Sequence, residues 1–162
     1  MSLHGSRTQS GQAALEMALT MPLVFVLIMG VLELGLAFNA YVTVAAAARE
    51  GARAGAIYLY DSAYSQAAND QNRESGTGTG TPYTENIRDT VQASLGILKT
   101  SPSNFNKATD VTISYTPQVD PINTRKGSIV TVQVTYRYAF LTQVLPTPST
   151  ITMQARASAR IE

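Results

Sequence analysis

An apolar run near the N-terminal end constrains the fold of this chain more than any other feature. From Ala13 to Ala48 the chain is apolar apart from Glu16, Glu33 and a few small polar side chains. A helix needs about 20 such residues to cross a bilayer, so the run is long enough. Its uncharged part, Met17–Leu32, would form a helix about 24 Å long, slightly shorter than the hydrocarbon core. We therefore predict a membrane-crossing helix in which Glu33 lies near an interface or is paired.

The helix is expected to continue beyond the bilayer, since neither a Pro nor a Gly pair interrupts the chain between Gly35 and Tyr60. A helix over residues 12–60 would be about 70 Å long. Pro22 lies inside it, lacks a backbone donor and should bend the rod near its start. Four glycines lie in this segment: Gly30, Gly35, Gly51 and Gly55. Their small size would allow close packing between helices; the alternative is that they occur there by chance.

Removal of the apolar run as a secretory signal is an alternative, with Ala45–Ala48 as the cleavage segment. The run is longer than an ordinary signal sequence, and it continues without a helix breaker into Ala52, Ala54 and Ala56. A helix that stays in the protein is therefore the preferred interpretation.

The rest of the chain predicts a connector and a small exported domain. Residues 61–84 lose hydrophobic periodicity and end in a Gly-Thr repeat, which is typical of a flexible exposed segment. Asn86–Leu98 has the spacing of an amphipathic helix. Strands are predicted where apolar and polar residues alternate, at Asp110–Thr116, Ser128–Tyr138 and Ile151–Ile161. The predicted fold class is α+β, with a long N-terminal helix and, at residues 85–162, a small antiparallel sheet domain with one short helix.

Composition argues against catalysis and against nucleic-acid binding. The chain has one histidine, His4, and no cysteine, so neither a Ser-His-Asp arrangement nor a thiolate metal site can be built outside the N-terminal tail. Its net charge is +1, and its basic residues are scattered rather than gathered into a patch. We expect no enzyme activity, cofactor, metal, nucleic-acid partner or small-molecule substrate.

Three stretches of this sequence resemble the TadE/TadG-like pilins of tight-adherence, or Flp-type, pili, which are related to type IV pilins. They are Gly11–Pro22 (GQAALEMALTMP), Gly30–Gly35 (GVLELG) and Ala48–Arg53 (AREGAR). The resemblance covers about residues 10–60. It implies a leader over residues 1–11, cut by a prepilin peptidase after Gly11. Gln12 would then be the new N-terminus and Glu16 the fifth mature residue.

Two carboxylates in the apolar run need partners, because a charge in an apolar segment is costly. Glu16 is expected to pair with the amino group of Gln12, in the same chain or a neighbouring one, or else to mark the headgroup boundary. Glu33 has no opposite charge within one helical turn. Its candidate partners are Arg49 or Arg53 of a neighbouring copy displaced by about 24 or 30 Å. A solvated Glu33 just outside the membrane is the alternative.

The resemblance implies a structural subunit that resides in the inner membrane as a precursor. An ATP-driven assembly machine would then build it, through its N-terminal helix, into a helical filament on the cell surface used for adhesion. The alternative from another class is a single-pass anchored envelope protein whose exported domain binds a partner and which does not polymerise.

Overall fold

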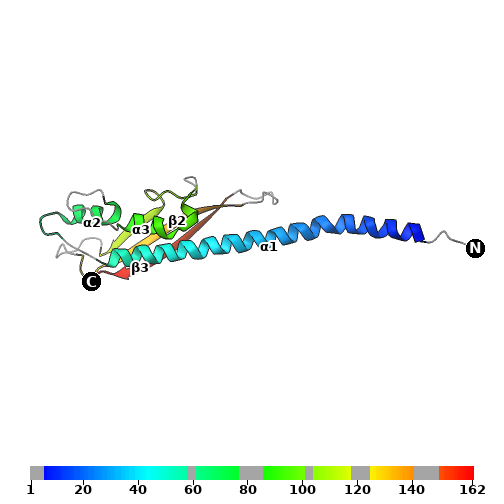
Figure 1. Cartoon of the computed structure of the whole chain (residues 1–162). Coiled ribbons are helices and arrows are strands. Elements are labelled where there is room, and N and C mark those ends of the chain that lie inside the picture. Colours follow the sequence, from blue (N-terminus) through cyan, green and yellow to red (C-terminus); the bar gives the residue numbers. More distant parts are fainter. Residues whose placement is uncertain (1–5, 58–60, 77–85, 101–103, 118–124, 141–149) are drawn as a thin grey trace, which may run out of the picture.

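The computed structural model describes residues 6–57, 61–76, 86–100, 104–117, 125–140 and 150–162. A long helix, α1 (Ser6–Ala56), carries a small domain on its C-terminal half, and its N-terminal half extends away from that domain (Figure 1). The domain contains two short helices, α2 (Gln66–Ser75) and α3 (Ile87–Ser94), a 3-10 turn, η1 (Gly96–Thr100), and the strands β1 (Val111–Thr116), β2 (Ile129–Ala139) and β3 (Thr150–Arg160). The predicted α+β class is confirmed.

The strands form an antiparallel sheet in the order β1-β2-β3. Each begins and ends within a residue or so of its predicted bounds, because the alternation of apolar and polar side chains marks a strand with one covered face. Along β2 this face is fully buried at Val130, Val132 and Val134. At the start of β3 the covering ends, and Ile151 remains 43% exposed.

α1 packs on the sheet and on α3 with a stripe of mostly small residues. The stripe repeats every three or four positions, which keeps it on one helix face. Its buried members are Glu33, Ala37, Ala40, Val44, Ala47, Ala48, Gly51, Ala52 and Gly55. Because most of these side chains end at Cβ or lack it, the sheet and α3 lie directly against the helix.

The glycines of α1 fall into two groups. A methyl group added at Gly51 would lie 2.4 Å from Cγ2 of Val91, and one added at Gly55 would lie 3.0 Å from Cδ1 of Ile87. These two glycines therefore allow the domain of the same chain to approach the helix. A methyl group at Gly30 or Gly35 would meet no atom within 4 Å, so their part in packing between helices stays a prediction.

α2 lies in the segment predicted to be a flexible connector, and that prediction is wrong for residues 66–75. The hydroxyl of Ser65 caps the helix by accepting from the N–H of Ala68, and Gly76 ends it in a left-handed conformation. Its buried residues are polar: Asn69, Asp70, Asn72 and Arg73. A helix that buries polar side chains has no apolar period to reveal it. The Gly-Thr repeat lies outside the described residues.

The bounds of α1 differ from those predicted. The helix begins at Ser6, within the predicted leader, and ends at Ala56 rather than at residue 60. Beyond its end, the guanidinium of Arg73 donates to the carbonyl oxygen of Ile57 at 3.1 Å, which satisfies a backbone acceptor near the helix terminus. α1 passes through Pro22 as a continuous helix, and a bend there stays a prediction.

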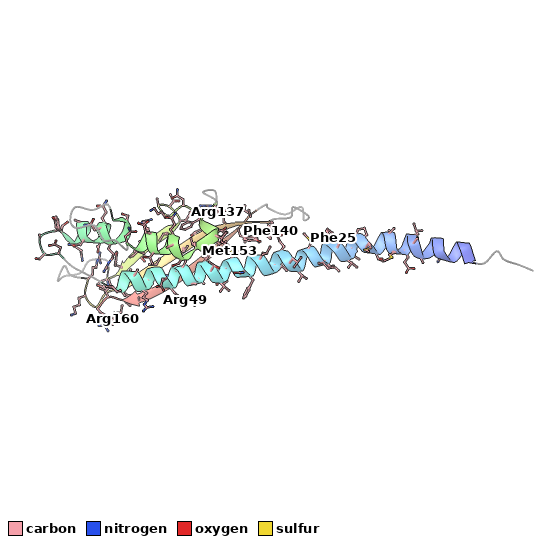
Figure 2. All side chains as sticks on the ribbon, in the orientation of Figure 1. Phe25, Arg49, Arg137, Phe140, Met153 and Arg160 are labelled. Atoms are coloured by element: carbon pink, nitrogen blue, oxygen red, sulfur yellow. The ribbon has the colours of Figure 1, made fainter. Side chains whose placement is uncertain are left out.

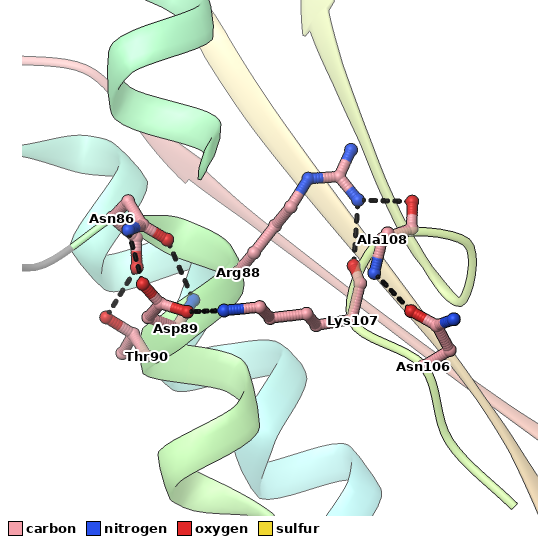
Figure 3. Close-up of polar contacts among 7 residues, drawn as sticks. All are labelled: Asn86, Arg88, Asp89, Thr90, Asn106, Lys107 and Ala108. Atoms are coloured by element: carbon pink, nitrogen blue, oxygen red, sulfur yellow. Dashed lines mark hydrogen bonds and ion pairs between the residues drawn. The ribbon is translucent and has the colours of Figure 1, made fainter. Parts of the chain in front are cut away.

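A polar cluster joins α3 to the turn before β1 (Figure 3). The side chain of Asn86 caps α3 by accepting from the N–H of Asp89 at 2.8 Å. Asp89 also forms an ion pair with Lys107, and this hydrogen bond lowers the pKa of the Asp89 carboxyl. Arg88 donates to the carbonyl oxygens of Lys107 and Ala108, each at 2.8 Å. Since the ion pair is about half exposed, the capping and backbone contacts do most to hold α3 in place.

Replacing Gly51 by Ala should destabilise the folded domain by about 1–3 kcal/mol, because the new methyl overlaps the stiff side chain of Val91. The matched control is Gly35→Ala, in open space, where the helix propensity of Ala adds up to about 1 kcal/mol. Urea unfolding of both variants in detergent measures the difference. Equal stability of the two variants would contradict the packing described here.

The buried Asp110 should make the domain less stable in acid. Although burial works the other way, hydrogen bonds from Arg137 at 2.8 and 2.9 Å and from the N–H of Asn106 hold the pKa of this carboxyl below its usual range. A carboxyl with a lowered folded pKa stabilises above its unfolded pKa of about 4, and this contribution is lost as the pH falls. Thermal unfolding of Asp110→Asn should therefore differ most from the native chain near neutral pH. A difference that grows in acid would contradict this assignment.

Candidate membrane-anchoring and assembly surface

The N-terminal half of α1 is an uncovered apolar surface. Residues 11–28 are all exposed, and among residues 11–56 the first that the domain buries is Glu33. From Gly11 to Ala56 the helix is long and apolar enough to cross a membrane. Residues 12–32 measure about 32 Å along the helix axis, close to the thickness of a bilayer hydrocarbon core. We call residues 12–32 the free half of α1.

Glu33 marks the point where the domain meets the helix. It is 8% exposed, and its Oε1 accepts a hydrogen bond from the hydroxyl of Tyr138 at 3.1 Å. The ring of Tyr138 stands edge-on to Phe140, with centroids 5.6 Å apart. Burial, together with the hydrogen bond to Glu33, raises the pKa of the Tyr138 hydroxyl. The domain thus covers this carboxylate and supplies it with a donor.

The expectation that Glu33 is solvated is therefore wrong for this chain. The carboxylate is not solvated, and it has a partner within its own chain. The contact was missed because Tyr138 is 105 residues away in the sequence. The position of Tyr138 in a strand of alternating apolar and polar residues indicated only that its ring faces the core.

The arginines predicted to meet a neighbouring Glu33 lie on the open side of α1. Arg49 and Arg53 are both exposed, and no described residue forms a salt bridge with either. Figure 2 shows Arg49 on the half of α1 that carries the domain, far from Phe25 on the free half. The structure brings neither arginine to the Glu33 of the same chain, so their pairing with another copy stays a prediction.

The predicted cleavage segment and Glu16 lie on the free half or at its start. Gly11 and Gln12 are exposed and helical, and a methyl group at Gly11 would meet no atom within 4 Å. Glu16 is exposed, and its backbone carbonyl accepts from the hydroxyl of Thr20 at 3.0 Å. Gln12 and Glu16 are four residues apart on one helix, so they share a face.

A second polar cluster, between α2 and the end of β1, has a structural role. The guanidinium of Arg125 donates to Asp70 at 2.8 Å and to the carbonyl oxygen of Pro117 at 3.0 Å, and it lies 4.3 Å from the ring centre of Tyr115. Arg125 is 5% exposed and has a left-handed backbone, with φ at 57°. These contacts use the charge to fasten α2 to the sheet. Among the described residues there is no group of acidic or His side chains that could hold a metal ion.

Replacing Tyr138 by Phe should lower the stability of the domain by about 1–2 kcal/mol, because Glu33 loses a hydrogen bond in a buried site. Tyr136→Phe is the matched control, since that residue is also buried and its hydroxyl accepts a long contact of 3.5 Å from Asn104 among the described residues. Thermal unfolding in detergent should show the larger loss for Tyr138→Phe. A larger loss for the control would contradict the assignment.

Comparison with known proteins gives one family match, and it falls on α1. Residues 11–53 match the family described as TadE-like protein. The matched segment contains the free half of α1 and most of the buried stripe. No curated protein and no solved structure gives a significant match. The resemblance inferred from the sequence is confirmed at residues 11–53, the segment that matches the TadE-like family.

Proposed function

We propose that this chain is a structural, non-catalytic subunit of a tight-adherence pilus, and that α1 is both its membrane anchor and its assembly element. The observation that carries the proposal is the division of α1 at Glu33. Residues 12–32 expose large apolar side chains, whereas the following residues carry the folded domain. The TadE-like segment lies on this helix, and the family's association with Tad pili supports the assignment.

The free half of α1 needs apolar surroundings in every state of the protein. Its exposed side chains include Leu19, Leu23, Phe25 and Leu27, each more than half exposed. Lipid covers them in the precursor, and the helices of other copies would cover them in a filament. Lipid tails are as apolar as leucine, so leaving the bilayer gains little hydrophobic free energy. An assembly machine that supplies energy is therefore an expected partner.

Cleavage of the leader would create the groups that position one subunit against the next. Cutting after Gly11 leaves a new amino group on Gln12, about 6 Å along the axis from Glu16. An ammonium group and a carboxylate in apolar surroundings attract each other more strongly than in water. We infer that Glu16 of one copy receives the terminal amino group of Gln12, either from itself or from its neighbour.

A single-pass envelope protein that never polymerises would use the same helix as an anchor. Processing and incorporation into filaments separate the two functions. Mass spectrometry of the chain from its native membranes and from sheared surface material gives the mature N-terminus, and electron microscopy with immunolabelling shows whether the chain is in filaments.

For the pilus subunit we expect an N-terminus at Gln12 and labelled filaments. Glu16→Gln should still be processed, but its amount in filaments should fall by about tenfold, the effect of losing an interaction worth about 1.4 kcal/mol. The matched control is Glu50→Gln, which removes an exposed carboxylate from the domain-bearing half of α1. An intact N-terminus together with label confined to membranes would favour the anchored envelope protein.

A further inference from the structure

The exposed apolar surface of α1 does not stop at Glu33. Five large side chains beyond it remain 46–69% exposed, on faces of the helix that the domain leaves open: Leu34, Leu36, Phe38, Tyr41 and Val42. The next charged residue along the chain is Arg49. From Glu33 to Val42 the helix rises about 14 Å. This surface is continuous with the free half of α1.

The neighbouring end of the domain also carries apolar side chains. Ile151 pairs with Tyr138 across β2 and β3, and it is 43% exposed. Phe140, half-buried, packs edge-on against Tyr138. Figure 2 shows Phe140 at the end of the domain from which the free half of α1 emerges. The contact between Tyr138 and Glu33 fixes this end of the sheet to the helix.

The length of α1 indicates which layer of a membrane this end would meet. Residues 12–32 match the hydrocarbon core, and residues 12–41 extend about 45 Å, close to the thickness of a bilayer with its headgroups. Glu33 to Tyr41 therefore falls in the outer headgroup region. Aromatic residues such as Tyr41 are typical of this layer.

We propose that, before any assembly, the end of the domain bearing Tyr138, Phe140 and Ile151 rests on the outward-facing surface of the membrane that α1 crosses, with lipid headgroups as its partner. The domain would then sit on the bilayer instead of being held away from it. Glu33 would lie under the domain at headgroup depth, shielded from the lipid. The inference needs the membrane anchor but not polymerisation, so it can hold even where the pilus function fails.

The chain has neither Cys nor Trp, so one introduced residue gives an unambiguous reporter. The full chain carrying Ile151→Cys, labelled with the fluorophore NBD, would be placed in lipid nanodiscs that contain doxyl-labelled lipids. Ser158→Cys is the control, because it is exposed on the same strand about 23 Å farther from the proposed contact. Unchanged thermal unfolding shows that both labelled chains are folded. As a second reporter on α1, Tyr41→Trp is quenched by brominated lipids if it lies at the same depth.

We expect a blue-shifted emission and a clear loss of NBD fluorescence to the doxyl lipids at position 151, with little loss at position 158. Tyr41→Trp should lose fluorescence to brominated lipids. Equal and weak quenching at 151 and 158 would overturn the proposal. A blue shift at 151 that depends on the protein-to-lipid ratio, without quenching by lipid, would also overturn it, because a second copy would then cover the surface.

Discussion

The stripe of small residues along α1 is the contact on which the rest of this structure depends. A sheet of β1, β2 and β3 with one apolar face needs a cover, and in this chain α1 and α3 provide it. Ala47, Ala48 and Gly51 leave room for the side chains of β2 and α3 to reach the helix backbone. Gly51 and Gly55 lower the stability of the helix itself, and close packing against the domain offsets this loss. The domain is consequently built onto the helix and is not tethered to its end.

This packing divides α1 into two functional parts, and Glu33 lies at their boundary. On one side, the side chains are exposed and apolar, and in the proposed function they contact lipid or other helices. On the other, one face is occupied by the domain, and the open face changes from apolar residues near Tyr41 to charged ones at Arg49, Glu50 and Arg53. The domain covers the carboxylate at the boundary, and the hydrogen bond that Tyr138 donates offsets part of the cost of burying it. The buried stripe thus joins the apolar helix to the folded domain, and the contact between Glu33 and Tyr138 lies at its N-terminal end.

The features that could be predicted from the sequence are those that a local pattern of residues marks. Alternation located the strands, spacing located α3, and an apolar run with Gly11, Glu16 and Pro22 indicated the TadE-like segment. The sequence could not predict α2, because Asp70 and Arg73 are buried through an ion pair with Arg125 and a hydrogen bond to the carbonyl of Ile57, groups that lie outside the helix. It could not separate Gly51 from Gly35, because both lie in the same apolar helix and differ only in what packs against them. The partner of Glu33 could not be predicted because Tyr138 is 105 residues away in the sequence.

The central claim, that α1 changes from membrane element to domain support near Glu33, is tested most directly by cysteine accessibility along the helix. Single cysteines at Leu19, Leu27, Phe38 and Ala46, all exposed positions, would be treated with a water-soluble maleimide in the full chain in bilayers. We expect no labelling at the first two positions, slow labelling at Phe38 and fast labelling at Ala46. Fast labelling at Leu19 and Leu27 would contradict the claim, because the free half of α1 would then lie in water.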